Sequence, residues 1–202
     1  MIQLSDRVAS SNQVPSLNSV EQNVTSSLTQ PVGAVLSATP VTIKTIRDQL
    51  KVQVLDALLS GMRYPSGLLH QRLRGKQLVY VVHALPLKFQ EQDFLFTYAL
   101  TDSDNVQKVL NIKEQSMQEL THKITVQQFE LAKSQVLFNM QNTLQNRHDK
   151  SKHIVSQLIK YGRMIDMVEF EKELNALTID DIKKMATVIF NNQTQFVKYN
   201  NK

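Results

Sequence analysis

The chain has 202 residues, of which 42% are hydrophobic and 20% charged, and its formal net charge is +5. This length and apolar content are enough for one ordinary globular domain with a sizeable core. The net charge is too weak and too dispersed to indicate a nucleic-acid-binding surface, so no nucleic-acid partner is expected. The sequence contains no cysteine, which excludes disulfides, thiolate metal ligands and a cysteine nucleophile.

No targeting or membrane-spanning segment is predicted from the sequence. No run approaches the roughly 18 consecutive apolar residues of a membrane span. The N-terminus, MIQLSDRVASS, lacks the apolar core of a signal peptide. As written, the chain is therefore expected to be soluble and cytoplasmic.

Residues 1–40 are dominated by Ser, Gln, Asn, Thr and Val and are interrupted by three prolines. This composition predicts a polar, linker-like arm that is mobile unless a partner binds it. Within the arm, Val32–Ala38 would add a strand if the domain offers a free sheet edge. Residues 41–202 are expected to form the domain itself.

After the arm, apolar residues recur at steps of three and four from Ile43, which predicts a helix to about Leu59 that stops at Gly61. A short helix is predicted over Gly67–Arg74, with Ser66 as its N-cap. Gly75 is expected to end it in the left-handed conformation.

Two β-rich runs follow, Gln77–Phe89 and Asp93–Thr101, and predict an antiparallel hairpin. Helical spacing returns from Ser103 and again from Thr125, with a break near residues 147–152. The last predicted elements are a helix that begins after Thr178 and a strand over Thr194–Tyr199. This order predicts an α+β fold, a two-layer α/β sandwich with a mostly antiparallel sheet and helices packed on one face.

The residues by themselves indicate no complete catalytic machinery. Zinc hydrolysis needs two imidazoles on one helix face with a carboxylate base, as in H-x-x-E-H, and no pair of the five histidines has that spacing. There is no G-x-S-x-G serine motif and no glycine-rich phosphate loop. The densest basic cluster, Arg72, Arg74 and Lys76, is read from charge alone as a solvated helix end.

One stretch carries more specific information: VLDALLSGMRYPSGLLHQRLRGKQLVYVVHA, residues 54–84. It resembles a segment in the C-terminal half of insulinase/pitrilysin-family zinc metallopeptidases, where a helix, a short arginine-containing helix and a strand follow one another. The resemblance continues through four later segments and covers roughly residues 42–200. These segments are Phe94–Leu100, the helix predicted after TDSDNV, TVQQFELAK at Thr125–Lys133 and LTIDDIKKMA at Leu177–Ala186.

The resemblance implies a non-catalytic, substrate-contacting half that binds no cofactor itself. Zinc is expected in a homologous partner half or subunit that carries H-x-x-E-H, and the two halves would enclose a chamber for peptide substrate. The resemblance also assigns Tyr80 and Arg74 to substrate binding and transition-state stabilisation, for which phenol and guanidinium donors are suited. Alone, the chain is not expected to hydrolyse peptides.

Two departures from the family pattern bear on this assignment. Arg74 and Tyr80 are one residue closer together than is usual in the family, and Gly67 stands where the family has an arginine. These departures leave open an alternative from another class, a degenerate and catalytically inactive scaffold or assembly subunit of the same family.

Overall fold

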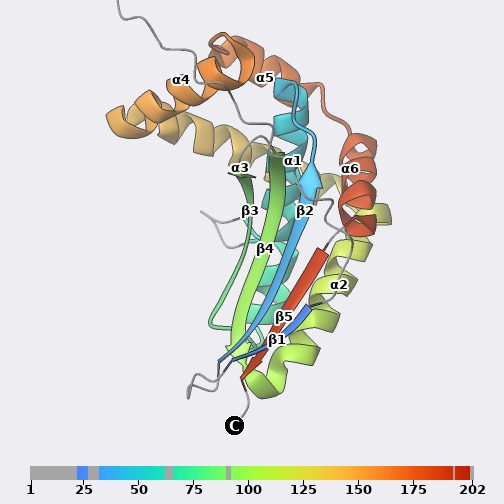
Figure 1. The fold of residues 1–202 in the computed structure, drawn as a ribbon. Helices are drawn as coiled ribbons and strands as arrows, with labels where there is room; N and C mark the ends of the chain where they lie inside the picture. The colour runs from blue at the N-terminus through green and yellow to red at the C-terminus, as the bar shows by residue number, and fades with distance from the viewer. Residues whose placement is uncertain (1–21, 27–31, 62–65, 90–91, 193, 201–202) are drawn as a thin grey trace, which may run out of the picture.

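The computed structural model describes residues 22–26, 32–61, 66–89, 92–192 and 194–200 (Figure 1). Its strands are β1 (Gln22–Ser26), β2 (Val32–Val41), β3 (Val81–Phe89), β4 (Gln92–Asp102) and β5 (Thr194–Asn200). Its helices are α1 (Ile46–Leu59), α2 (Val106–His122), α3 (Val126–Gln145), α4 (Arg147–Tyr161), α5 (Met167–Asn175) and α6 (Ile179–Asn191). A short π-helix, η1 (His70–Arg74), precedes β3, and a 3-10 turn, η2 (Ser103–Asn105), precedes α2.

The sheet has the strand order β1-β5-β2-β4-β3, in which β1 and β5 are parallel and the other neighbours antiparallel. The predicted hairpin is present, with Val81 opposite Leu100 at one end and Phe89 opposite Gln92 at the other. The mostly antiparallel sheet and the α+β class are therefore confirmed.

The strand predicted over residues 32–38 is present as part of β2. It lies inside the sheet, between β4 and β5, rather than at an edge. Because β2 continues to Val41, it runs across the boundary predicted between the arm and the domain. The predicted arm before residue 22 lies outside the described residues.

Alternation along the strands explains why the helices gather on one side of the sheet (Figure 1). Every second residue of β2, of β3 as far as Ala84 and of β4 from Leu95 to Thr101 is buried on the side of the helices, as Val35, Val82 and Ala99 show. The other side chains of these strands form a half-buried apolar face that no described helix covers. This open face carries, among others, Leu36, Val81, Leu85, Phe96, Tyr98 and Leu100.

The boundaries of three helices follow the sequence pattern, but Ser66 does not cap the short helix as predicted: η1 begins after Leu69 without a side-chain cap, and Ser66 Oγ accepts a hydrogen bond from Gln135. Thr125 with Gln128 and Thr178 with Asp181 form capping boxes at the starts of α3 and α6. The predicted break falls at Asn146, whose side chain caps α4.

Ser60 joins the end of α1 to the edge of β3. Its hydroxyl accepts a hydrogen bond from the Ala84 backbone N–H (2.8 Å) and lies within donating distance of Asp56 Oδ1 (3.0 Å) and Ala84 O (3.3 Å). The hydroxyl has one proton, so it donates fully to one of these acceptors at a time. Burial raises the pKa of Asp56 to about 7, although the Ser60 hydrogen bond acts in the opposite direction.

Gly67 lies against this same junction. A Cβ atom at Gly67 would come within 2.5 Å of Leu59 O and Ser60 N, both of which are backbone atoms. No side chain fits there without moving the end of α1 or the start of the following turn. The close approach therefore explains why this position is a glycine in this chain.

The turn after η1 differs from the prediction. Gly75 is right-handed (φ −60°), so its assignment as a left-handed helix end is wrong. The Gly75 N–H bonds to His70 O and so continues the wide π turn, and the left-handed residue is Gln77 (φ 56°). The chain reverses there, where Gln77 N–H bonds to Arg74 O.

Gly67→Ala is expected to lower the free energy of unfolding by about 3 kcal/mol or more, because the added methyl group collides with the α1 backbone. Urea denaturation followed by circular dichroism measures the change. Gly162→Ala is the control: Gly162 is left-handed (φ 68°) but has open space around it, so its loss is expected to be about 1 kcal/mol. Equal losses would contradict the close approach at Gly67.

Asp56→Asn is expected to stabilise the protein at alkaline pH. The native state holds the Asp56 proton up to a pKa of about 7 and the unfolded chain releases it near 3.8, so native stability falls as the pH rises between these values. The substitution should therefore raise the free energy of unfolding by up to about 4 kcal/mol at pH 8 and change it little at pH 4. Denaturation at both pH values measures this. The exposed Asp180→Asn should show no such pH-dependent gain.

Candidate functional site

η1 and the start of β3 bring Arg74 and Tyr80 to one hollow of about 400 Å³. Arg74 is the last residue of η1, and Tyr80 directly precedes β3. Asp102, the last residue of β4, lies on the same hollow because the hairpin register brings the two strand ends together. The two residues named from the resemblance are therefore neighbours in space, while Asp102 was not predicted.

Hydrogen bonds link these three residues. Arg74 Nη1 donates to the backbone oxygen of Tyr80 (2.7 Å), and the Tyr80 hydroxyl donates to Asp102 Oδ1 (2.5 Å). The Tyr80 backbone N–H donates to Leu100 O (2.8 Å), which extends the β3–β4 pairing by one residue. The Tyr80 side chain is 58% exposed, so the pairing fixes its backbone while the ring faces solvent.

The hydrogen bond to Asp102 raises the pKa of Tyr80, because the carboxylate accepts the phenol proton and its negative charge disfavours a phenolate. Tyr80 is consequently a neutral hydrogen-bond donor at neutral pH. Together with the Arg74 guanidinium, it gives the hollow two donor groups suited to a carbonyl oxygen or an oxyanion.

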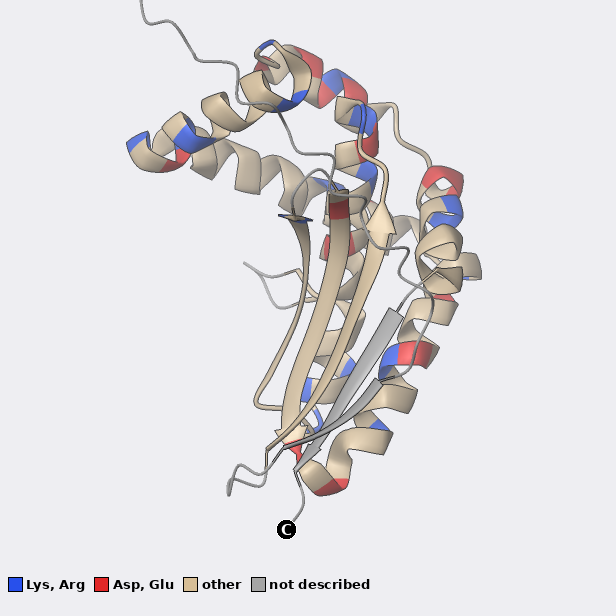
Figure 2. Ribbon diagram, in the orientation of Figure 1, with Lys and Arg blue, Asp and Glu red and all other residues tan. Residues whose placement is uncertain are grey.

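The rest of the predicted basic cluster does not act with Arg74. Arg72 turns to α2, where it pairs with Glu119 (2.5 Å) and bonds to Ser116 Oγ (3.2 Å). Figure 2 shows acidic and basic residues mixed along the helices, whereas β2, β3 and β4 carry few of either. This distribution gives no support to a nucleic-acid-binding band among the described residues.

Two histidines that are distant in sequence meet behind Arg74. The ring centroids of His70 and His83 are 5.6 Å apart, and His70 is 6% exposed. Burial lowers the pKa of both rings, and the positive charge of Arg74 adds to the effect. Both are therefore neutral at neutral pH, and they add no charge to the hollow.

Neither a metal centre nor a membrane-spanning helix is found in the part of the chain that the structure describes. No group of three or more His, Asp or Glu side chains there is arranged to hold a metal ion. No helix there is both long enough and apolar enough to cross a bilayer.

The sequence profile of the peptidase M16 inactive domain matches residues 12–136. This chain therefore belongs to the peptidase M16 family, the insulinase/pitrilysin peptidases, through its inactive domain. The predicted family is thus confirmed, and the chain is a non-catalytic M16 half. No curated protein sequence matches it.

Solved structures share the fold at low sequence identity. A chain of complex III2 from Candida albicans, with Inz-5 bound, is 14% identical with a TM-score of 0.75, over 90% of this chain and 46% of that one. A protease from Helicobacter pylori is 16% identical with a TM-score of 0.72, over 87% and 43%. A mutant of the ferredoxin protease FusC, in complex with Arabidopsis ferredoxin, is 15% identical with a TM-score of 0.66, over 90% and 20%. This chain thus spans less than half the length of each of these structures.

Asp102→Asn is expected to lower the pKa of Tyr80 towards the ordinary tyrosine value, because it removes the carboxylate that holds the phenol proton. Ultraviolet absorbance titration measures the change, with Tyr80→Phe identifying the contribution of this ring. The exposed Asp180→Asn is the control and should leave the titration unchanged. An unchanged Tyr80 titration in Asp102→Asn would contradict the described hydrogen bond.

Proposed function

We propose that this chain forms one wall of the substrate chamber of a zinc metalloendopeptidase and binds peptide substrate there, with zinc held by a separate H-x-x-E-H half. The observation that supports the proposal most is the convergence of Arg74 and Tyr80 on one open hollow. These are the residues that the family resemblance assigns to substrate contact, and they come from two different elements, η1 and the start of β3.

The chemistry of the hollow fits a peptide backbone. Arg74 and Tyr80 are hydrogen-bond donors, and peptide carbonyl oxygens are acceptors. A carbonyl that gains negative charge during hydrolysis accepts stronger hydrogen bonds than in its ground state, so the same donors would favour the transition state. To do this, the Tyr80 hydroxyl would exchange Asp102 for substrate, and its exposure leaves the ring free to turn.

The open face of the sheet supports a chamber wall. Its half-buried apolar side chains, such as Leu36, Phe96 and Leu100, are covered by no described helix. A second half packed opposite this face would remove apolar surface from water and enclose a space beside the hollow. The solved structures of similar fold are about twice as long or longer, which is consistent with further domains in such assemblies.

The test is reconstitution with a homologous subunit that carries H-x-x-E-H and comes from the same genome. Mixing the two is expected to create peptide cleavage that neither shows alone. Tyr80→Phe should then lower kcat about 100-fold, the usual loss for one oxyanion donor. Tyr161→Phe is the matched control, because its hydroxyl bonds to Gln49 Oε1 (2.6 Å) in α1, away from the hollow.

Circular dichroism would establish that both variants remain folded. Full activity in Tyr80→Phe would refute the role of Tyr80, and the absence of cleavage with every zinc-bearing partner of the genome would refute the peptidase proposal itself.

A second candidate, an inactive scaffold or assembly subunit, is favoured by a specific observation. Both donors are occupied within the chain, Arg74 by the Tyr80 carbonyl and Tyr80 by Asp102. Moreover, Gly67 has no room for the arginine that the family places there. This candidate would be supported if the chain forms a stable complex with a homologous subunit but the complex cleaves no peptide. The wild type and Tyr80→Phe should then form the complex equally well.

A further inference from the structure

A second hollow lies at the other end of the β3–β4 hairpin. It has a volume of about 340 Å³ and lies between α1, α3, α4, the start of α5 and β3. We call it the inner hollow. Leu85 and Pro86 of β3 line it, five and six residues along the chain from Tyr80, so roughly 16–20 Å separates it from the Arg74–Tyr80 hollow.

Two of the polar groups that line the inner hollow are buried acceptors without donors. Gln53 Oε1 from α1 and Asn139 Oδ1 from α3 are both buried and have no hydrogen-bond partner. The Asp56 carboxyl faces the same space, with a hydrogen bond from Ser60. Buried acceptors without donors are costly, so the two amide oxygens beside the Asp56 carboxyl favour a ligand that supplies N–H groups.

The charge around the inner hollow also favours a cation. Among the described residues that line it, Asp56 and His153 are the ionisable ones. Burial lowers the pKa of His153, and its Nε2 lies 2.8 Å from Gln157 Nε2, so the ring is neutral at neutral pH. No described lysine or arginine lines the space, which leaves Asp56 as the source of charge.

The rest of the inner hollow is lined by apolar side chains, which favour an organic cation over a metal ion as its ligand. Pro86, Val136, Met140 and Phe170 line it beside the acceptors. An alkyl chain can pack against such walls while its charged end reaches the oxygens. A hydrated divalent cation would gain nothing from them, and one carboxylate with two amide oxygens is a poor ligand set for it.

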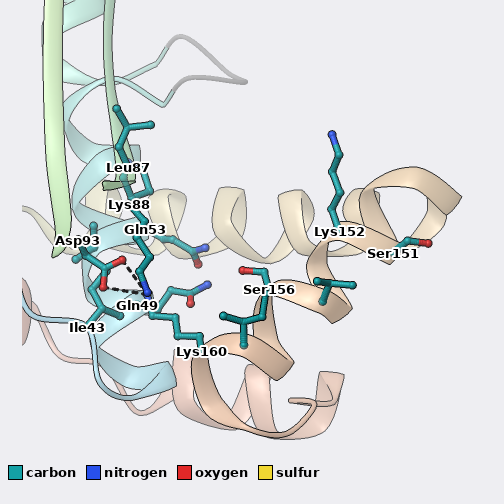
Figure 3. Close-up of a pocket in the computed structure, with 14 residues that line it drawn as sticks. Ile43, Gln49, Gln53, Leu87, Lys88, Asp93, Ser151, Lys152, Ser156 and Lys160 are labelled. Atoms are coloured by element: carbon teal, nitrogen blue, oxygen red, sulfur yellow. Dashed lines mark hydrogen bonds and ion pairs between the residues drawn. The ribbon is translucent and has the colours of Figure 1, made fainter. Parts of the chain in front are cut away.

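A larger hollow of about 670 Å³ adjoins the inner one and shares Gln49, Gln53 and Pro86 with it (Figure 3). It carries the lysines that the inner hollow lacks. Figure 3 shows Lys160 reaching Asp93, at 3.2 and 3.4 Å from its two carboxylate oxygens, so the positive charge of Lys160 is paired.

We propose that the inner hollow binds an organic cation, the alkylammonium or guanidinium group of a basic side chain or a free amine, through Asp56, Gln53 and Asn139. The carboxylate and the two amide oxygens accept its N–H groups, and the apolar walls hold its stem. This site is independent of the proposed peptidase function, and its test requires no zinc-bearing partner.

The test is an NMR titration of the full chain at pH 8 with Nα-acetyl-lysine amide. Nα-acetyl-norleucine amide, which lacks the ammonium group, is the uncharged control and should not bind. Asp56→Asn should weaken binding by about tenfold and Asn139→Ala by about fivefold, the usual effect of losing a hydrogen bond to a charged group. Glu171→Gln, an exposed carboxyl-to-amide change on α5, should leave the affinity unchanged.

A second arm uses n-butylammonium to identify the source of the cation. Tighter binding of the lysine derivative supports a basic side chain of a polypeptide, and tighter binding of n-butylammonium supports a small free amine. Either result supports the site.

A third arm varies the pH. Binding should tighten from pH 6 to pH 8, because a proton on Asp56 competes with the cation. His153 faces the same space and would repel the cation if it were protonated, so Asp56→Asn separates the two contributions: it should abolish the pH dependence. Equal affinity of wild type and Asp56→Asn, equal binding of the norleucine derivative, a pH dependence that survives Asp56→Asn, or no saturable binding would each overturn the proposal.

Discussion

The hydrogen bonds of Ser60 at the end of α1 are the constraint on which both hollows depend. They fix the last turn of α1 to the edge of β3 at Ala84, and the backbone of Gly67 packs directly against the same turn. From this junction the chain runs into η1, which ends at Arg74, and then into β3, which begins beside Tyr80. A shift of the junction would therefore move the donors of one hollow and the acceptors of the other together.

Much of the fold follows from patterns within short stretches of sequence. The alternation in β3 and β4 and the capping boxes at Thr125 and Thr178 act between neighbouring residues, and these elements were predictable for that reason. The position of β2 inside the sheet was not predictable, because it depends on pairing with β4 and β5, which are distant in sequence. The π turn of η1 was also not predicted, because one extra residue in a turn hardly changes the spacing of the hydrophobic residues.

Some residues of the candidate site were likewise predictable from the sequence, and others were not. Arg74 and Tyr80 were predicted as site residues from the similarity of their sequence segment to the family. Their spacing along the chain would not have placed them together, because a π turn lies before Tyr80. Asp102 is the partner that sequence reasoning missed, because only the hairpin register places it beside Tyr80. His70 and His83 likewise meet through the fold, in a pair that no helical interval indicates. Register and turn geometry thus decide which polar groups meet at this end of the hairpin.

The two hollows beside the β3–β4 hairpin differ in their hydrogen-bonding groups: one presents donors and the other acceptors. These groups also differ in their effect on the stability of the native state. At Tyr80 the donors are exposed and satisfied, so water or substrate can replace their partners at little cost in stability. Near Asp56 the amide oxygens of Gln53 and Asn139 are buried without donors, and a carboxyl whose pKa lies near 7 destabilises the native state at neutral and higher pH. Asparagine or leucine there would relieve that cost. Retaining a costly charged group beside two unpartnered amides is expected where binding, rather than folding, requires the charge.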